Sequence, residues 1–194
     1  MTALRSVAVF CGSRNGHAPK YREAALELGA GLARAGIRLV FGGGRVGLMG
    51  AVADATLAGG GQVIGVIPEF LEQWEVAHAG VTELIVTDSM HTRKTRMFEL
   101  SDAFISFAGG LGTFDETFEI LTWRQLRLHK KPVLICDIGG SAAPLVNLID
   151  SAVAEGFAPA DAREFFEVIE GVPALLGRLA RLEPATATTG TERL

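Results

Sequence analysis

One stretch, residues 103–116, limits what this chain can fold into more than any other. It reads AFISFAGGLGTFDE. Its first five residues are largely apolar without polar alternation, which is typical of a buried strand. Gly109, Gly110 and Gly112 then allow a turn and the close approach of a ligand, and Thr113 stands where a helix N-cap belongs. A strand, a glycine turn and a helix start together predict an anion site, because the free amides and the positive dipole end of the helix point to one spot.

The same residues also have a purely structural explanation. Thr113 and Glu116 are spaced as Thr-x-x-Glu, the pattern of a capping box in which each side chain satisfies the other's backbone amide. Short motifs of this kind also occur by chance, so these residues alone leave both interpretations open.

The length and the charge of the chain narrow its class. At 194 residues it is expected to form one domain, residues 1–182, followed by a tail, residues 183–194, that we expect to be disordered. A net charge of −4 and a pI near 5.6 argue against nucleic acid or an anionic membrane as the main partner. No apolar run approaches the roughly 20 residues of a membrane span, and residues 1–10 lack a secretory core, so we expect a cytoplasmic protein.

The cysteines and histidines do not suggest a disulfide or a metal site. Cys11 and Cys136 each follow an apolar run, where a buried and reduced thiol is the common case. The four histidines are dispersed and lack a Cys or His partner at ligand spacing. We therefore expect no metal.

Apolar runs alternate with helical patterns along the chain. Strands are expected at residues 6–10, 37–41, 63–67, 84–86, 103–107, 133–136 and 165–169, and helices at residues 19–35, 51–58, 89–100, 113–129, 145–155 and 173–182. This alternation predicts a doubly wound, Rossmann-like parallel sheet of the α/β class with helices on both faces. In such sheets ligands bind beyond the carboxyl ends of the strands.

The unusual loops fall at these strand ends. Gly12–Ser13 follows the first strand, Gly42–Gly44 the second, Glu69 the third, and Ala108–Gly112 the strand of the opening stretch. Agreement of several independent loops on one rim favours a nucleotide-like ligand over isolated helix capping.

Two common nucleotide motifs do not fit well. Residues 42–47 match the dinucleotide fingerprint Gly-x-Gly-x-x-Gly, but they follow the second strand, and no acidic residue ends the next strand at the usual distance. Glu69 comes too late for that role, so NAD binding is weakly supported. Neither glycine loop carries the lysine of a Walker loop, which excludes ATP hydrolysis by that route.

Several longer segments resemble the signatures of one enzyme family. They are MHTRKTRM at residues 90–97, GGLGTFDE at residues 109–116, LTWRQL at residues 121–126, VFGGGRVGLMG at residues 40–50 and FCGS at residues 10–13. Together they resemble the Lonely Guy family of cytokinin-activating enzymes, which are nucleoside 5′-monophosphate phosphoribohydrolases. The likeness covers roughly residues 5–180, and the combination is specific whereas any single piece is not.

The resemblance implies hydrolysis of the N-glycosidic bond of an N6-substituted adenosine 5′-monophosphate, which gives the free base and ribose 5-phosphate. It also implies a homodimer, no cofactor, and a catalytic pair formed by Arg93 and Glu116. By the same matching, the substrate-binding residues are Ser13, Gly43, Glu75, Lys94, Gly109, Gly110, Gly112, Thr113 and Thr122. The chain departs from the family pattern at Ala108, where the family usually has Pro, and at Thr92, where it usually has an acid.

The two catalytic residue types suit this reaction. Breaking the bond to the base builds positive charge on the ribose ring, and a fixed carboxylate such as Glu116 stabilises that charge or activates the attacking water. Arg93 stays protonated, so it is a poor proton donor, but its fork can hold phosphate or sugar oxygens and orient Glu116.

Two other functions stay open at this point. A nucleotide carrier or sensor would bind a phosphate-bearing ligand without turnover, although it has no need for a carboxylate beside an anion. The label lysine decarboxylase, which similar sequences also carry, requires a Schiff-base lysine for pyridoxal phosphate. None of Lys20, Lys94, Lys130 and Lys131 sits in an evident pocket for that cofactor. Plain AMP and its N6-substituted derivatives both remain candidate substrates.

Overall fold

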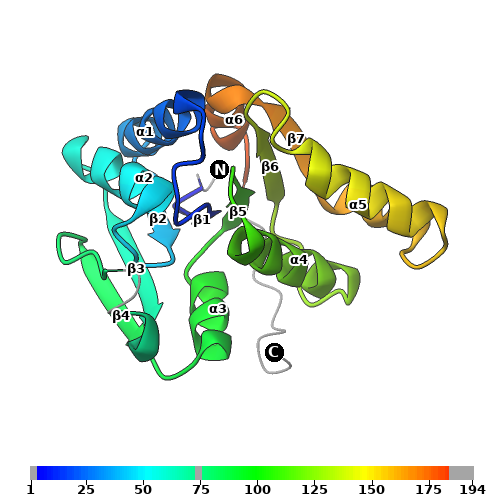
Figure 1. The fold of residues 1–194 in the computed structure, drawn as a ribbon, viewed down its shortest axis with the longest axis horizontal. Coiled ribbons are helices and arrows are strands. Elements are labelled where there is room, and N and C mark those ends of the chain that lie inside the picture. Colours follow the sequence, from blue (N-terminus) through cyan, green and yellow to red (C-terminus); the bar gives the residue numbers. More distant parts are fainter. Residues whose placement is uncertain (1–3, 73–75, 184–194) are drawn as a thin grey trace.

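A parallel sheet forms the centre of the molecule. In this computed structural model the described residues are 4–72 and 76–183, and within them the sheet has seven strands. The strands are β1 (Ser6–Phe10), β2 (Arg38–Phe41), β3 (Val63–Pro68), β4 (Glu83–Thr87), β5 (Ala103–Ser106), β6 (Val133–Asp137) and β7 (Glu167–Glu170). Every neighbouring pair is parallel, in the order β4-β3-β2-β1-β5-β6-β7. The doubly wound, Rossmann-like sheet that the sequence predicts is confirmed (Figure 1).

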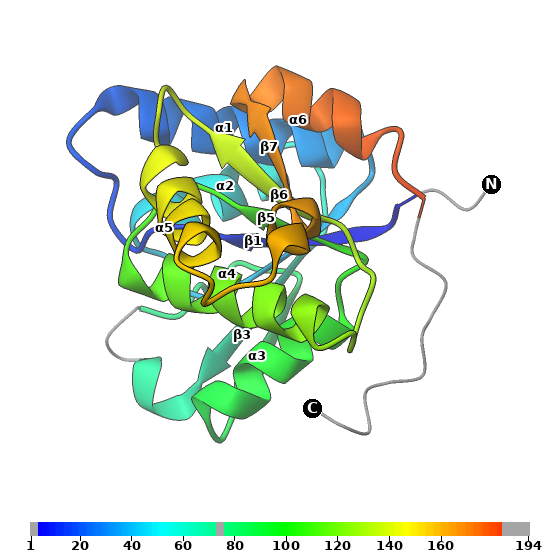
Figure 2. The same ribbon diagram turned by 90° about the vertical axis from the view of Figure 1, so that its right-hand side faces the viewer.

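Helices cover both faces of this sheet. They are α1 (Pro19–Arg34), α2 (Gly47–Ala58), α3 (Met90–Glu99), α4 (Leu111–Gln125), α5 (Ala143–Ala154) and α6 (Gly171–Leu179), with short 3-10 turns η1 (Glu69–Leu71) and η2 (Ala160–Phe165). Helices α1, α2 and α6 lie on one face, and α3, α4 and α5 lie on the other (Figures 1 and 2). None of these helices is both long and apolar enough to cross a membrane.

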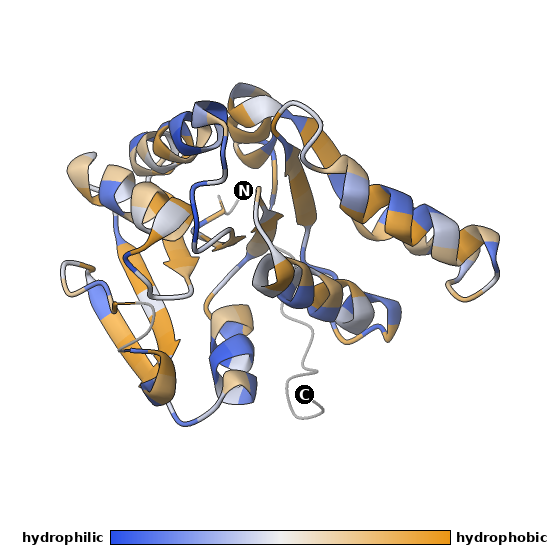
Figure 3. Cartoon of the chain, viewed as in Figure 1, coloured by the Kyte–Doolittle hydropathy of each residue, from blue (hydrophilic) through white to orange (hydrophobic). Residues whose placement is uncertain are grey.

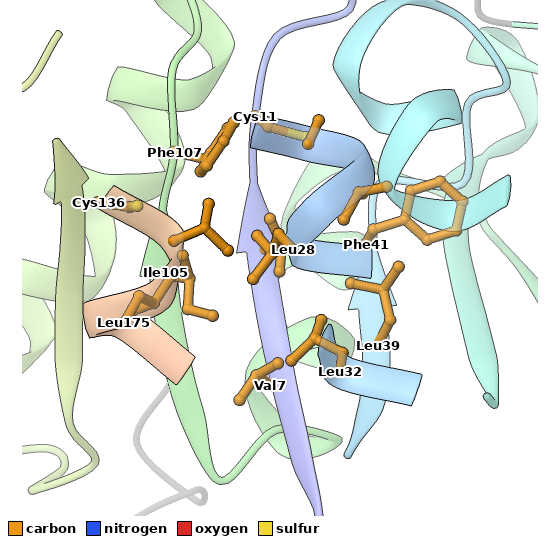
Figure 4. Packing of buried hydrophobic residues seen from close by; sticks show 14 of the residues in the cluster. Val7, Cys11, Leu28, Leu32, Leu39, Phe41, Ile105, Phe107, Cys136 and Leu175 are labelled. Carbon is orange, nitrogen blue, oxygen red and sulfur yellow. The ribbon is translucent and has the colours of Figure 1, made fainter. Parts of the chain in front are cut away.

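The inner strands β1, β3 and β5 are buried on both faces, which explains their continuous apolar runs. All five residues of β1 are buried, and they alternate between the two helix layers. Val7 and Val9 pack into the cluster of α1, α2 and α6, whereas Ala8 and Phe10 pack against α3, α4 and α5. Figure 4 shows the first cluster, where Val7 lies beside Leu28 and Leu32 of α1. The central strands are accordingly hydrophobic in Figure 3.

Local signals in the sequence set several helix ends. Pro19 occupies the first turn of α1, where its missing N–H is no loss, and Gly36 takes a positive φ of 65° just after that helix. The Ser89 hydroxyl accepts a hydrogen bond of 3.1 Å from the Thr92 amide and so caps α3 as predicted. The predicted tail lies outside the described residues apart from Glu183.

The order of the strands reverses at β1, which lies between β2 and β5. The loops after β1 and β5 therefore meet at the carboxyl edge of the sheet, and the Gly12 amide donates a hydrogen bond of 3.0 Å to the Ala108 carbonyl oxygen. Such a reversal leaves a crevice between loops that diverge to opposite faces.

Candidate active site

A cavity of about 600 Å³ lies at this reversal of strand order. Its lining residues come from the loop after β1, the loop after β5 and the starts of three helices, α1, α2 and α4: Gly12, Ser13, Arg14, Asn15, Gly16, Tyr21, Leu48, Ala108, Gly109, Gly110, Leu111 and Gly112. The volume is in the range that holds a nucleotide-sized ligand. Two of the four rim loops predicted from the sequence, Gly12–Ser13 and Ala108–Gly112, thus meet around one cavity, whereas Gly42–Gly44 and Glu69 do not line it.

Helix α4 begins at this cavity, but not where the sequence predicts. Its N-cap is Gly110 and its first residue is Leu111, so Thr113 is already inside the first turn. The Thr113–Glu116 capping box is therefore wrong. The helix starts two residues earlier because glycine at the N-cap needs no side-chain cap. The amides of residues 111–113 have no acceptor within the helix, and two of these residues, Leu111 and Gly112, line the cavity.

The Thr113 hydroxyl is left without a partner by this arrangement. Thr113 is 3% exposed, and its Oγ1 has no hydrogen-bond partner among the described residues. The hydroxyl lies against Gly109, where any Cβ would collide with it. A buried polar atom without a partner costs about 1–3 kcal/mol. Thr113 does not itself line the cavity, but it follows Leu111 and Gly112, which do, so its hydroxyl is a candidate donor to a ligand bound at the start of α4.

Arg93 is buried below the carboxyl ends of β2 and β3. Its Nε donates a hydrogen bond of 3.1 Å to the Val66 carbonyl oxygen, and its Nη2 donates one of 3.1 Å to the Gly42 carbonyl oxygen. A Cβ at Gly42 would collide with the guanidinium group. The glycine after β2 therefore makes room for Arg93, which fixes the guanidinium in one orientation.

Glu116, which the family resemblance pairs with Arg93, lies next to it. The Glu116 Oε1 is 3.8 Å from the Arg93 Nη2, and the Glu116 side chain is 12% exposed. Burial raises the pKa of the Cys11 thiol at the end of β1, and the negative charge of Glu116 raises it further. Neither Arg93 nor Glu116 is among the residues that line the cavity.

Lys94 occupies a different position from its neighbour Arg93. Its Nζ is 2.8 Å from the Asp115 Oδ2 and 3.4 Å from the Glu119 Oε2. Burial opposes the charge of Lys94, but hydrogen bonds and attraction from these two acids outweigh it and raise the pKa of Lys94. In this geometry Lys94 connects α3 to α4 and is not among the residues that line the cavity.

Only some of the other predicted site residues lie at the cavity. Ser13 lines the cavity and is exposed, together with the three loop glycines after β5. Gly43, with a positive φ of 80°, is buried against β3, and its carbonyl accepts a hydrogen bond of 2.9 Å from the His78 amide. Thr122 lies far along α4 in a separate apolar groove, so the structure does not bring it to this cavity. Glu75 lies outside the described residues.

Three cavity residues with polar side chains were not predicted from the sequence. Arg14, Asn15 and Tyr21 line the cavity beside Ser13. The polar loop after the first strand signals their region, but nothing in the spacing indicates which side chains of a loop reach a ligand. Among the described residues, no group of three or more His, Cys, Asp or Glu is placed to hold a metal ion.

Comparisons with known proteins give further information. A family model described as "Possible lysine decarboxylase" matches residues 49–179. A cytokinin riboside 5′-monophosphate phosphoribohydrolase of Rhodococcoides fascians is 50% identical over 154 residues, which are 79% of this chain and 78% of the relative. A protein of the same description from Arabidopsis thaliana is 42% identical over 181 residues, or 93% of this chain and 85% of the relative.

The fold is also found among solved structures. The molybdenum cofactor carrier protein of Chlamydomonas reinhardtii superposes with a TM-score of 0.68 at 22% identity, over 91% of this chain and 96% of that chain. At this level of identity the likeness shows a shared fold alone.

Proposed function

The chain belongs to the Lonely Guy family of cytokinin riboside 5′-monophosphate phosphoribohydrolases, and from this premise we propose that it hydrolyses N6-substituted adenosine 5′-monophosphates. The products are the free base and ribose 5-phosphate. The observation that carries the proposal is the position of a partly buried carboxylate, Glu116, five residues after the first residue of α4, whose start is suited to bind an anion.

The start of α4 provides the binding site for the 5′-phosphate. The amides of residues 111–113 and the positive end of the helix dipole attract the anion, and the Thr113 hydroxyl gains the acceptor that it lacks in the protein alone. Arg14 adds a positive charge on the opposite wall of the cavity. Binding energy from the phosphate, remote from the bond that breaks, then positions the ribose.

Glu116 acts on the sugar in this arrangement. As the bond to the base breaks, positive charge develops on the ribose ring, and the carboxylate stabilises that charge or takes a proton from the attacking water. Water supplies the hydroxyl that joins C1′, and the base leaves with the electron pair of the broken bond and gains a proton. Arg93 orients Glu116 through their contact of 3.8 Å and does not act as a proton donor.

The lysines do not support decarboxylase chemistry. The Lys20 Nζ donates to the Gly139 carbonyl oxygen at 3.0 Å, the Lys131 Nζ to the Phe98 carbonyl oxygen at 2.7 Å, and Lys94 pairs with two acids. Lys130 lines hollows at the far end of α4. No lysine lines the candidate active site, so the matched family description is a label that this site's residues do not fit.

The proposal is tested by incubating the purified protein with AMP and with N6-isopentenyl-AMP and measuring free base by chromatography. We expect release of base from at least one nucleotide. We expect none from the matching nucleosides, because they lack the phosphate that binds at the start of α4. Heat stabilisation by AMP without any release of base would instead indicate a carrier or sensor.

The assembly we propose is a homodimer formed through the groove of α4, α5 and η2. This groove of about 220 Å³ is lined mainly by apolar residues, and Leu148 beside it is 58% exposed. Thr122 lies in the same groove, so in a dimer it would face the partner. Light scattering should give twice the 20.5 kDa of one chain, and Leu148→Glu should reduce the mass to one chain. A single-chain mass for the unmodified protein would refute this assembly.

We also propose that the protein works in a reducing compartment, the cytoplasm. Cys11 and Cys136 are both buried free thiols, which suits such a compartment.

A further inference from the structure

A second cavity lies at the opposite end of α4 from the candidate active site. It measures about 440 Å³ and is lined by Arg124, Arg127, His129, Lys130, Glu164 and Phe165. An adjoining hollow of about 370 Å³ shares Arg124, Arg127 and Phe165 with it. Because α4 has 15 residues and rises 1.5 Å per residue, the two sites are about 22 Å apart. We call this second site the basic cavity.

The basic cavity carries an excess of positive charge in a chain whose net charge is −4. Three cations, Arg124, Arg127 and Lys130, face one carboxylate that lines the basic cavity, Glu164, and one that lines the adjoining hollow, Asp161. His129 adds no charge near neutral pH, since burial lowers its pKa to about 4. The neighbouring acid Glu167 is already engaged, because Arg178 donates hydrogen bonds of 2.7 and 2.8 Å to its two oxygens.

The cations of the basic cavity retain donors for a ligand. Arg124 donates from Nη1 to the Lys131 carbonyl oxygen at 2.7 Å, and this is its one side-chain hydrogen bond within residues 4–72 and 76–183. Over the same residues, the side chains of Arg127 and Lys130 make no hydrogen bond or ion pair. A single surface arginine without a partner is common and needs no explanation. Three cations around one hollow need a shared explanation.

Helix capping does not account for these residues. Cations near a helix C-terminus are favoured by the dipole, and this covers Arg124 in the last turn. However, the carbonyl oxygens of Thr122, Trp123 and Arg124 already accept backbone hydrogen bonds of 2.9 Å from the loop that follows.

Arg127 is the most informative of the three. It stands at the position after the helix cap with a positive φ of 61°, a conformation that glycine adopts at no steric cost. An arginine at this position is explained if its side chain has a function at the cavity.

We propose that the basic cavity binds a small phosphomonoester through Arg124, Arg127 and Lys130. Two guanidinium forks and an ammonium match the charge and the oxygens of a phosphate dianion, and a bidentate fork favours phosphate over a single-charged carboxylate. The site is separate from the binding site of the substrate phosphate at the start of α4, and it does not depend on the proposed reaction.

The test is a titration of the ¹⁵N-labelled full chain with inorganic phosphate, followed by amide NMR shifts at constant ionic strength against chloride. We expect saturable shifts at residues 124–130, reported separately from those at residues 109–113. In the variant Arg124→Gln/Arg127→Gly/Lys130→Gln the first set should weaken about tenfold or more, while the second set persists. The control Arg22→Gln/Arg34→Gln/Arg38→Gln removes the same charge from an exposed surface and should change neither set.

The single variant Arg127→Gly is the control for misfolding, because glycine adopts the positive φ of this position without strain. It should keep or raise the melting temperature and still weaken phosphate binding at residues 124–130. Shifts there that chloride reproduces, or that survive in the triple variant, would overturn the proposal. Loss of shifts at residues 109–113 alone would count against the proposed function and leave the basic cavity intact.

Discussion

At the scale of single residues, the site depends on side chains held by backbone that only glycine permits. Arg93 fits below β2 because Gly42 has no Cβ, and Thr113 fits against the loop after β5 because Gly109 has none. The sequence motifs identify these glycines as a phosphate-binding pattern. The structure adds that two of them make space for a specific polar side chain.

The unpartnered hydroxyl of Thr113 leads to a prediction about substrate binding. Thr113→Val keeps the shape of the side chain and removes no hydrogen bond of the Oγ1 atom. We expect the melting temperature to hold or rise, while the KM for the nucleotide rises about tenfold because a phosphate oxygen loses one donor.

Thr117→Val is the matched control for this change. The Thr117 hydroxyl bonds to the Thr113 carbonyl oxygen at 2.6 Å and to the Ser106 hydroxyl at 2.8 Å, so its loss should lower stability instead. An unchanged KM for Thr113→Val would show that the hydroxyl does not meet the substrate.

At the scale of elements, the site is formed where two helices are tied together. Arg93 lies on α3 and Glu116 on α4, and Lys94 connects the same two helices through Asp115 and Glu119. Lys94→Met should therefore lower kcat about tenfold, because the catalytic pair loses its fixed spacing, and should leave KM within about twofold. Steady-state kinetics with one substrate separates the two constants. A rise in KM without a change in kcat would instead support direct contact of Lys94 with the nucleotide.

The same scale shows what the sequence could and could not predict. Alternating apolar patterns predict the strands and their order along the chain, and each rim loop is placed at the correct end of its strand. The position of Thr122 could have been checked by arithmetic, since nine residues of helix separate it from Thr113 by about 14 Å. The N-cap of α4 could not, because Thr-x-x-Glu and glycine are both acceptable starts and the packing of Thr113 against Gly109 decides between them.

The order of strands across the sheet also needed the structure. Nothing in the local pattern says that β5 pairs with β1, yet this pairing brings the loops at residues 12–16 and 108–112 together. The different contacts of Lys94 and Arg93 also needed the structure. Adjacent residues on a helix point about 100° apart, so the two side chains meet different neighbours.

At the scale of the whole molecule, a buried histidine makes stability depend on pH. The His129 Nε2 is 2.9 Å from the Ile120 carbonyl oxygen, and its Nδ1 accepts a hydrogen bond of 3.1 Å from the Lys131 amide. This pattern fits the neutral ring, in which Nε2 carries the proton. Burial first, and then the charges of Arg124 and Lys131, lower the pKa of His129 to about 4.

The sign of the effect follows from this lowered pKa. Between pH 6.5 and 4, His129 is protonated in the unfolded chain but stays neutral in the folded chain. The free energy of unfolding therefore falls as the pH drops through this window. At pH 5 the loss relative to pH 7.5 should be about 2 kcal/mol from this residue. Urea unfolding at both pH values measures it, and His129→Gln should show a smaller loss. Equal losses in both proteins would assign the effect to other groups.

The most direct test of the account is the effect of Glu116→Gln on turnover and on binding of the same nucleotide. This change removes the charge and keeps the size of the side chain. The account predicts a fall in kcat of at least about 100-fold, with a dissociation constant for AMP that is unchanged or lower because a negative charge near the ligand is gone. Glu155→Gln, the same change at an exposed glutamate outside the candidate active site, should keep kcat within about threefold. Tighter binding of AMP by Glu116→Gln with an unchanged rate of base release would contradict the central role of this carboxylate.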